Sequence, residues 1–224
     1  MGNVGLAMRD GDIGRVVVIL KEESAGWSEQ AVTEVSRERD PFKVLVSTLI
    51  SLRTKDEVTR KASERLFRLA DTPESMVKLE ASAIEKSIFP AGFYRTKARH
   101  ILGTCTALLR DHGGRVPDEI EELLSLPGVG RKTANLVVTL GFGKPGICVD
   151  THVHRILNRL GYVRTRTPEE TERALRAKLP RRHWIEINDL LVTYGQRVCA
   201  PVSPFCSRCR LAPLCGRVGV TRSR

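Results

Sequence analysis

The sequence predicts an all-α protein, and three observations support that prediction. Apolar residues recur at helical spacing through most of the 224-residue chain. The helical patterns are separated by proline, glycine, threonine and aspartate at positions where helices begin or end. One apolar run, at 16–20, would suit a strand, but no second strand is evident to pair with it. The starts and stops together indicate about ten helices.

Six helices are expected in the first half of the chain. A first helix runs to Glu23 with Asp12 as its cap. Residues 41–52 are apolar on most sides and are expected to form a buried central helix. Thr54 and Glu57 make a capping box that opens the next helix. The other three helices are expected at 72–79, 82–90 and 96–112.

A tight glycine turn between two helices is the central motif of the chain. Residues 117–124 are expected to form a short helix with proline at its first position, and Pro127 stops it. Gly128 and Gly130 then supply a turn whose backbone can take positive φ and approach another molecule closely. The next helix is expected to end before Gly141, as its C′ glycine. Because a helix N-terminus attracts anions, this turn in so basic a protein is expected to bind a DNA phosphate.

Three further helices complete the prediction. An extended segment, 147–149, leads into Asp150, and a helix follows it. Thr167 and Glu170 form a second capping box, with proline at the first helical position. A last helix covers 180–198 and precedes a cysteine-rich segment.

The chain is basic, with 37 Lys and Arg against 26 Asp and Glu and a formal net charge of +11. Such a charge indicates a polyanionic partner, of which nucleic acid is the commonest, although charge spread over a solvated surface would also account for it. No apolar run is long enough to cross a membrane, and the N-terminus lacks the pattern of a signal peptide. We therefore expect a cytoplasmic protein that does not contact membranes.

Six cysteines fall into two groups. Two stand alone in apolar settings and are expected to be small buried side chains, Cys105 and Cys148. Four have the spacing Cys-x6-Cys-x2-Cys-x5-Cys, namely Cys199, Cys206, Cys209 and Cys215. Zinc sites usually combine two Cys-x2-Cys halves across a longer spacer, whereas a compact loop of four thiolates suits a 4Fe–4S cluster better. The loop is therefore predicted to bind such a cluster, with zinc and a metal-free set of oxidisable thiols as the alternatives.

Lys132 and Asp150 are the candidate catalytic residues. Lys132 lies in the first turn of the helix after the glycines, and a lysine amine is nucleophilic only when it is deprotonated. The positive helix end and burial in a cleft would favour the neutral amine, whereas a nearby carboxylate would favour the ammonium. Taken alone, Asp150 is typical of a helix N-cap and Lys132 of a phosphate contact.

Together these motifs resemble the endonuclease III family of bifunctional DNA glycosylases, within the helix-hairpin-helix superfamily. The resemblance rests on the hairpin at 126–135, on Asp150 eighteen positions after Lys132, and on the cysteine spacing. It extends to Pro41-Phe42, Leu49-Ile50-Ser51, Gly92-Phe93-Tyr94 and Lys97-Ala98, and so covers nearly the whole chain from residue 41 on.

The resemblance implies two helical lobes that flank a DNA-binding cleft. One lobe, residues 34–144, is a six-helix barrel that ends with the hairpin. The other, residues 1–33 and 145–224, carries the 4Fe–4S cluster in the loop at 199–215. The implied partner is double-stranded DNA with damaged bases or abasic sites. The protein is expected to be a monomer associated with the nucleoid.

The resemblance also implies a reaction. Lys132 attacks C1′ of a flipped nucleotide and releases its base, while Asp150 stabilises positive charge on the sugar and assists proton transfer. The resulting Schiff base permits β-elimination, which cuts the strand 3′ to the lesion. The family's usual substrates are oxidised or ring-saturated pyrimidines. The alternatives are a monofunctional glycosylase for mismatched or alkylated bases, and a non-catalytic DNA-binding iron–sulfur protein.

DNA contacts follow from the same resemblance. The turn is expected to grip the DNA backbone through Gly128, Val129, Gly130 and Arg131. Arg53 stands where the family commonly has a glutamine that enters the gap left by the flipped base; its alternative is a plain surface arginine. Phe93 stands where a leucine often wedges the duplex apart; its alternative is ordinary core. The loop at 200–205 lacks the basic residues that relatives often carry, although Arg208 and Arg210 lie near by.

Overall fold

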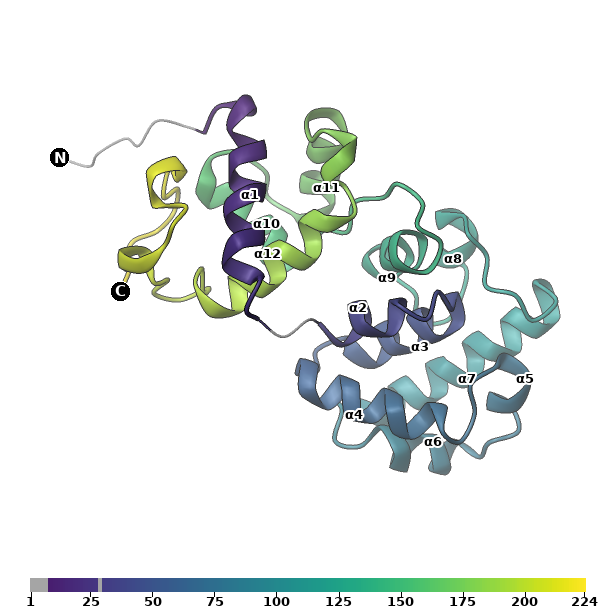
Figure 1. Cartoon of the computed structure of the whole chain (residues 1–224). Coiled ribbons are helices and arrows are strands. Elements are labelled where there is room, and N and C mark those ends of the chain that lie inside the picture. The colour runs from purple at the N-terminus through teal and green to yellow at the C-terminus, as the bar shows by residue number, and fades with distance from the viewer. Residues whose placement is uncertain (1–7, 28–29) are drawn as a thin grey trace. The chain divides into compact units, whose positions relative to one another are not determined.

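The computed structural model describes residues 8–27 and 30–224, and every regular element in this part of the chain is helical (Figure 1). The prediction of an all-α protein is therefore confirmed. The chain divides into two compact units, which we call the terminal unit (Met1–Ser28 with Ile147–Arg224) and the central unit (Glu29–Gly146). No described helix is long and apolar enough to cross a membrane.

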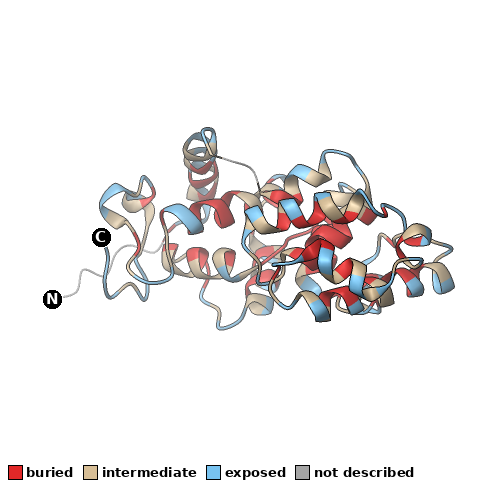
Figure 2. Ribbon diagram, turned by 90° about the horizontal axis from the view of Figure 1, so that it is seen from below, coloured by how far each residue is buried: buried red, intermediate tan, exposed pale blue. Residues whose placement is uncertain are grey.

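The central unit contains the helices around the glycine turn. Its described elements, of which η2 is a π-helical turn, are α2 Ala31–Ser36, α3 Pro41–Ser51, α4 Asp56–Phe67, α5 Pro73–Met76, α6 Ala81–Ile88, α7 Tyr94–Asp111, α8 Ile120–Leu124, α9 Arg131–Leu136 and η2 Val137–Gly141. Buried and exposed residues alternate along most of these helices, as an apolar face against a core requires (Figure 2).

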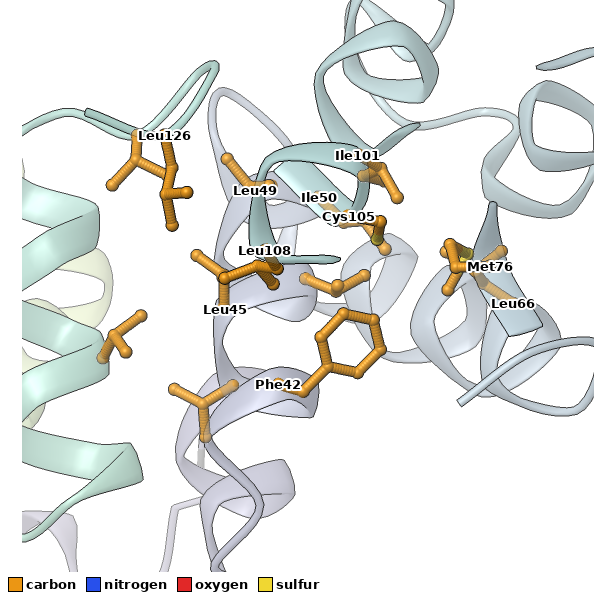
Figure 3. Close-up of a cluster of buried hydrophobic side chains, with 14 of the residues drawn as sticks. Phe42, Leu45, Leu49, Ile50, Leu66, Met76, Ile101, Cys105, Leu108 and Leu126 are labelled. Atoms are coloured by element: carbon orange, nitrogen blue, oxygen red, sulfur yellow. The ribbon is translucent and has the colours of Figure 1, made fainter. Parts of the chain in front are cut away.

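Helix α3 lies at the centre of the core of this unit. Every residue from 44 to 50 is buried, which confirms the prediction of a buried central helix. In Figure 3 the side chains of Leu45 and Ile50 on α3 lie close to Leu108 and Ile101 on α7. A helix that is apolar on most sides is stable only in such a position, because several of its faces need apolar partners.

The terminal unit joins the first helix of the chain to its second half. Its described elements are η1 Asp10–Asp12, α1 Ile13–Ser24, α10 Thr151–Leu160, α11 Pro168–Lys178, η3 Arg181–His183, α12 Glu186–Arg197, η4 Cys206–Arg208 and η5 Ala212–Leu214. The unit has a core of its own, in which Val16 and Leu20 of α1 pack with Leu157 of α10 and Leu191 of α12. The apolar run at 16–20 therefore lies in a helix and not in a strand.

Some predicted caps hold and others do not. The side chains of Asp150 and Thr167 accept backbone N–H groups at the starts of α10 and α11. Asp12 stands at the cap position of α1, but its side chain accepts no backbone N–H of that helix. Its carboxylate instead accepts the N–H of Arg9 and the side chain of Arg15. The α1 prediction is thus right in position and wrong about the cap.

The predicted capping box at Thr54 is wrong. Helix α4 begins at Asp56, and Lys55 at its cap position makes no side-chain bond to the helix. Thr54 Oγ1 instead accepts Lys97 Nζ at 2.7 Å and the N–H of Gly92 at 3.1 Å. The Thr54 hydroxyl group, which the sequence pattern assigned to the start of the helix, is therefore hydrogen-bonded to residues distant in the sequence.

The helix predicted at 117–124 is shorter than expected. It begins only at Ile120, since the chain before it is extended. Asp118 and Glu119, which were expected in its first turn, form ion pairs with Lys144, each at 2.8 Å. These two carboxylates therefore interact with Lys144 and not with the dipole of the helix.

Gly141 is not the C′ glycine of the helix after the turn. Helix α9 passes directly into η2, whose last residue is Gly141, and the glycine with positive φ is Gly143. A Cβ atom on Gly141 would lie 3.1 Å from Pro41 Cα. Glycine at 141 therefore permits the close approach of the start of α3.

Other helices differ from the prediction at their ends. The expected helices at 72–79 and 96–112 are α5 and α7, and α5 ends three residues early. The last predicted helix, 180–198, is divided into η3 and α12. Helix α2 was not predicted, because six residues give too short a pattern.

Candidate functional site

The glycine turn connects α8 to α9. The chain passes Pro127 into Gly128, whose φ of 77° is in the left-handed region. The N–H of Val129 closes the turn on the carbonyl oxygen of Leu126 at 3.1 Å. Gly130 is the N-cap of α9, and an added Cβ there would meet no atom within 4 Å. The turn therefore exposes backbone at the start of α9.

Helix α7 holds this turn in place. Thr104 Oγ1 donates to the carbonyl oxygen of Pro127 at 2.8 Å, and an added Cβ on Gly103 would touch the ring of Pro127 at 3.4 Å. His100 packs on Gly128 so closely that an added Cβ would lie 2.5 Å from its Nδ1. Both the backbone conformation and the available space at position 128 thus require glycine.

The residues predicted at the turn differ in what they can offer a ligand. Val129 is buried and its N–H closes the turn, so its side chain belongs to the core. Gly130 and Arg131 are exposed. Lys132 is the second residue of α9 and is partly buried.

Asp150 lies directly before α10. Its Oδ1 accepts the N–H groups of His152 and Val153, both at 2.9 Å. These bonds fix the orientation of the carboxylate and show that Asp150 is a helix cap. Asp150 belongs to the terminal unit and Lys132 to the central unit.

Arg53 and Phe93 occupy two loops of the central unit. Arg53 lies between α3 and α4 with a φ of 52°, and Phe93 caps α7 with a φ of 58°. Both values are uncommon for residues with a side chain. Phe93 is 64% exposed, so it is not part of the core. The guanidinium carbon of exposed Arg53 lies 5.6 Å from the centre of the Phe93 ring, within the range of a cation–π contact.

A buried lysine of α7 holds the loop that contains Arg53. Lys97 Nζ donates to the carbonyl oxygens of Ile50 and Leu52, each at 2.6 Å, and to Thr54 Oγ1 at 2.7 Å. Burial lowers the pKa of Lys97 to about 8. Sequence reasoning gave Lys97 no role. One feature of the sequence could have indicated that Lys97 is buried: it lies in the apolar stripe of α7, four residues before Ile101.

The four clustered cysteines follow α12 in the terminal unit. All four are free and partly buried, whereas Cys105 and Cys148 are fully buried as predicted. The short turns η4 and η5 shape the loop between the second and fourth of the clustered cysteines. No disulfide therefore competes with a metal for these thiols.

Two arginines of α10 hold the start of this loop. Arg159 donates to the carbonyl oxygens of Ala200 and Pro201, both at 2.7 Å. Arg155 donates to the carbonyl oxygen of Cys199 at 2.9 Å. The loop is thus anchored by backbone contacts in addition to its cysteines.

Hydrogen bonds also reach the sulfur atoms. They join Tyr194 Oη to Cys209 Sγ at 3.1 Å, Arg159 Nη1 to Cys199 Sγ at 3.4 Å and the N–H of Arg217 to Cys215 Sγ at 3.4 Å. Burial raises the pKa of the Cys209 and Cys215 thiols, and the neighbouring cysteines raise it further. The four sulfurs therefore lie within electrostatic range of one another.

The described part of the chain contains no group of three or more His, Cys, Asp or Glu side chains arranged around one metal ion. A zinc ion needs its ligands to converge on one point. In a 4Fe–4S cluster four thiolates hold the irons of one larger group, so the sulfurs stand further apart.

The basic residues beside the cysteine loop are engaged with the protein itself. Arg208 stacks on the ring of Phe205 at 4.1 Å from its centre. Arg210 pairs with Glu22 at 2.7 Å and with Glu23 at 3.6 Å. Both arginines are therefore less available to an external anion than their sequence positions indicate.

Comparisons with known proteins identify similar chains. A family model described as HhH-GPD superfamily base excision DNA repair protein matches residues 46–181. The chain is 52% identical over 179 residues to endonuclease III of Thermotoga maritima, which covers 80% of this chain and 84% of that protein. Among solved structures, a non-covalent endonuclease III–DNA complex matches with a TM-score of 0.83 and 33% identity, covering 93% of this chain and 95% of that one. A trapped endonuclease III–DNA covalent intermediate matches with a TM-score of 0.81 and 32% identity, covering 93% and 96%.

Proposed function

The chain belongs to the endonuclease III family of base excision DNA repair proteins, and from that premise we propose roles for its residues. The protein is a DNA glycosylase and AP lyase, which removes a base and cuts the strand at the abasic site. One observation carries the assignment of residues: Lys132 is the second residue of α9, directly after the exposed backbone of the glycine turn. An amine in that position lies beside any phosphate bound by the turn.

Lys132 is the proposed nucleophile. Its neutral amine attacks C1′ of the damaged nucleotide, the bond from C1′ to the base breaks, and the base leaves with the bonding electrons and takes up a proton. The attached nitrogen gives up a proton, and its lone pair then opens the sugar ring between C1′ and O4′ while O4′ takes up a proton. A protonated imine between C1′ and Lys132 Nζ remains. Removal of a proton from C2′ then expels the 3′ phosphate and cuts the strand.

Asp150 is the proposed electrostatic partner of this step. Its carboxylate is oriented by the N–H groups of His152 and Val153. A carboxylate held in this way stabilises the positive charge that develops on the sugar as the base leaves, and it can assist proton transfer. Both cap bonds fall on Oδ1.

The glycine turn is the proposed grip on the DNA backbone. Gly128 and Gly130 have no side chains to keep a phosphate away, and the start of α9 presents N–H groups and a positive dipole end. Exposed Arg131 adds charge, and Val129 contributes only backbone. Such contacts give affinity for the duplex without choosing a lesion.

Arg53 and Phe93 are the proposed contacts at the flipped nucleotide. An exposed aromatic ring can enter a base step as an apolar wedge, and a guanidinium can stack on a base. The proposed substrates are oxidised or ring-saturated pyrimidines in double-stranded DNA, because a damaged base that stacks poorly costs least to extrude. The enzyme is proposed to act as a monomer in the cytoplasm, at the nucleoid.

Cys199, Cys206, Cys209 and Cys215 are the proposed ligands of a 4Fe–4S cluster. They fit it because they are free, partly buried and close enough to affect one another electrostatically. The hydrogen bonds from Tyr194 and Arg159 are of the kind that tunes metal-bound thiolates. The cluster, when bound, supplies a covalent cross-link across the loop.

Strand cutting at a preformed abasic site tests the proposal. Lys132→Gln is expected to abolish cutting while the protein still binds the duplex. Lys61→Gln is the matched control, since Lys61 is exposed on α4 and pairs with Glu57. On a second duplex that carries one oxidised pyrimidine, base release without cutting by the wild type would indicate a monofunctional glycosylase. Duplex binding with neither reaction would indicate a non-catalytic DNA-binding protein.

A further inference from the structure

Two loops of the central unit are joined by direct backbone contact. A Cβ atom on Gly92 would lie 2.6 Å from the carbonyl oxygen of Arg53, so only glycine allows this approach. The N–H of Gly92 donates to Thr54 Oγ1 at 3.1 Å. The backbone flanking Phe93 is thus fixed to the backbone flanking Arg53.

Lys97 holds one of these loops from inside the protein. It is 5% exposed, and its three donors meet three neutral oxygens within 2.7 Å. A cap for α3 would account for the bonds to Ile50 and to Leu52, which is the C-cap residue of that helix. It does not account for the bond to the Thr54 hydroxyl, which lies two residues beyond the cap. The ammonium therefore organises the loop itself.

The loops in turn fix two unusual backbone conformations. A left-handed conformation is unfavourable for a residue with a side chain, so each persists only where its surroundings impose it. Arg53 and Phe93 both have this conformation, and each lies next to a residue of the Lys97–Thr54–Gly92 chain of hydrogen bonds. The two side chains meet as a stacked pair at 5.6 Å.

We propose that Lys97 is a positioning residue that, through Thr54 and Gly92, presents Arg53 and Phe93 to DNA as one rigid stacked pair. The inference rests on the proposed function, in which these two side chains meet the flipped nucleotide. A preformed pair loses little conformational freedom on binding, whereas two independent side chains would each lose the freedom of their rotamers. Lys97 therefore contributes to lesion selectivity without touching DNA.

A duplex with a tetrahydrofuran abasic analogue opposite 2-aminopurine tests this inference. The fluorescence of 2-aminopurine rises when this base is displaced from the stack. The selectivity is the protein's affinity for this duplex divided by its affinity for an undamaged duplex. Lys97→Met is expected to reduce the selectivity on the order of tenfold, about 1.4 kcal/mol, and to reduce the fluorescence rise. Affinity for undamaged DNA, which the glycine turn provides, is expected to stay the same.

A second variant keeps the test decisive if Lys97→Met fails to fold. Thr54→Val removes the shared acceptor and keeps the side-chain shape, and it is expected to reduce selectivity in the same direction. Thr59→Val is the matched control, because buried Thr59 bonds only within α4, to the carbonyl oxygen of Lys55. It is expected to leave selectivity unchanged.

A double-mutant cycle separates positioning from general stability. In a background of Arg53→Ala with Phe93→Ala, the Lys97→Met change is expected to cost no further selectivity, because the pair it positions is gone. Additive losses, or wild-type selectivity in folded Lys97→Met and Thr54→Val, would overturn the inference. A borohydride-trapped adduct of the wild type, made in parallel, shows whether the proposed function itself has failed.

Discussion

Thr104 donates its hydroxyl hydrogen to the carbonyl oxygen of Pro127 at 2.8 Å, and this bond fastens the glycine turn to α7. His100, one helical turn earlier on the same helix, closes the space over Gly128. The turn is therefore built as part of the core of the central unit, and its shape depends on α7 as much as on its own glycines.

Gly128→Ala is expected to destabilise the protein. The new methyl group would meet His100 within 2.5 Å, and φ at this position is 77°. Together, strain and overpacking should lower the free energy of unfolding by about 1–3 kcal/mol, as measured by urea denaturation. Gly130→Ala is the control, since its added methyl group meets nothing within 4 Å and its φ is −98°. Equal losses in the two variants would contradict this account of the turn.

Stability should depend on pH through Lys97. Burial lowers its pKa to about 8 in the folded protein, from the ordinary lysine value of 10.5. Between these values the unfolded chain binds more protons than the folded one, so this contribution to the free energy of unfolding grows as pH rises from about 8 to 10.5, and it is lost as pH falls through about 8.

The pH prediction is checked with Lys97→Met. The lost hydrogen bonds should lower stability at every pH, and the rise above about pH 8 should in addition become flatter than in the wild type. Lys61→Met, which changes an exposed lysine, should keep the wild-type slope. Parallel curves for wild type and Lys97→Met would show that Lys97 does not titrate in this range.

Iron content should distinguish the two sets of cysteines. The wild type is expected to be brown and to contain roughly four irons per chain. Cys206→Ser should lower the iron content and the visible absorption. Cys105→Ala should keep both, because burial raises the pKa of Cys105 to about 12 and leaves it a protonated thiol in the core. A colourless wild type with one zinc per chain would refute the cluster.

Local chemistry predicted much of this fold. Asp150 and Thr167 stand before proline or β-branched residues that begin helices, and both make the bonds that such positions favour. The same reasoning failed at Thr54, because a hydroxyl group bonds the nearest available partner in space, and Lys97 lies 43 residues away in the chain. Sequence patterns report only near neighbours.

In the candidate site, too, the sequence predicts local features but not contacts between distant segments. The glycine turn and the cysteine spacing are local, so the sequence indicates their positions. The stacking of Arg53 on Phe93 depends on two loops that meet only after α3, α6 and α7 have packed. The spacing of apolar residues does not predict the contact between Arg53 and Phe93. The one feature of the sequence that pointed to this region is the lysine in the apolar stripe of α7.

The nucleophile is the central claim, and peptide mapping of a trapped adduct tests it most directly. The wild type is incubated with a duplex containing one abasic site in the presence of sodium borohydride, digested with protease and nuclease, and analysed by mass spectrometry. A single sugar adduct is expected on Lys132, and none with Lys132→Gln. An adduct on another amine, such as the buried Lys97, or no adduct at all, would contradict it.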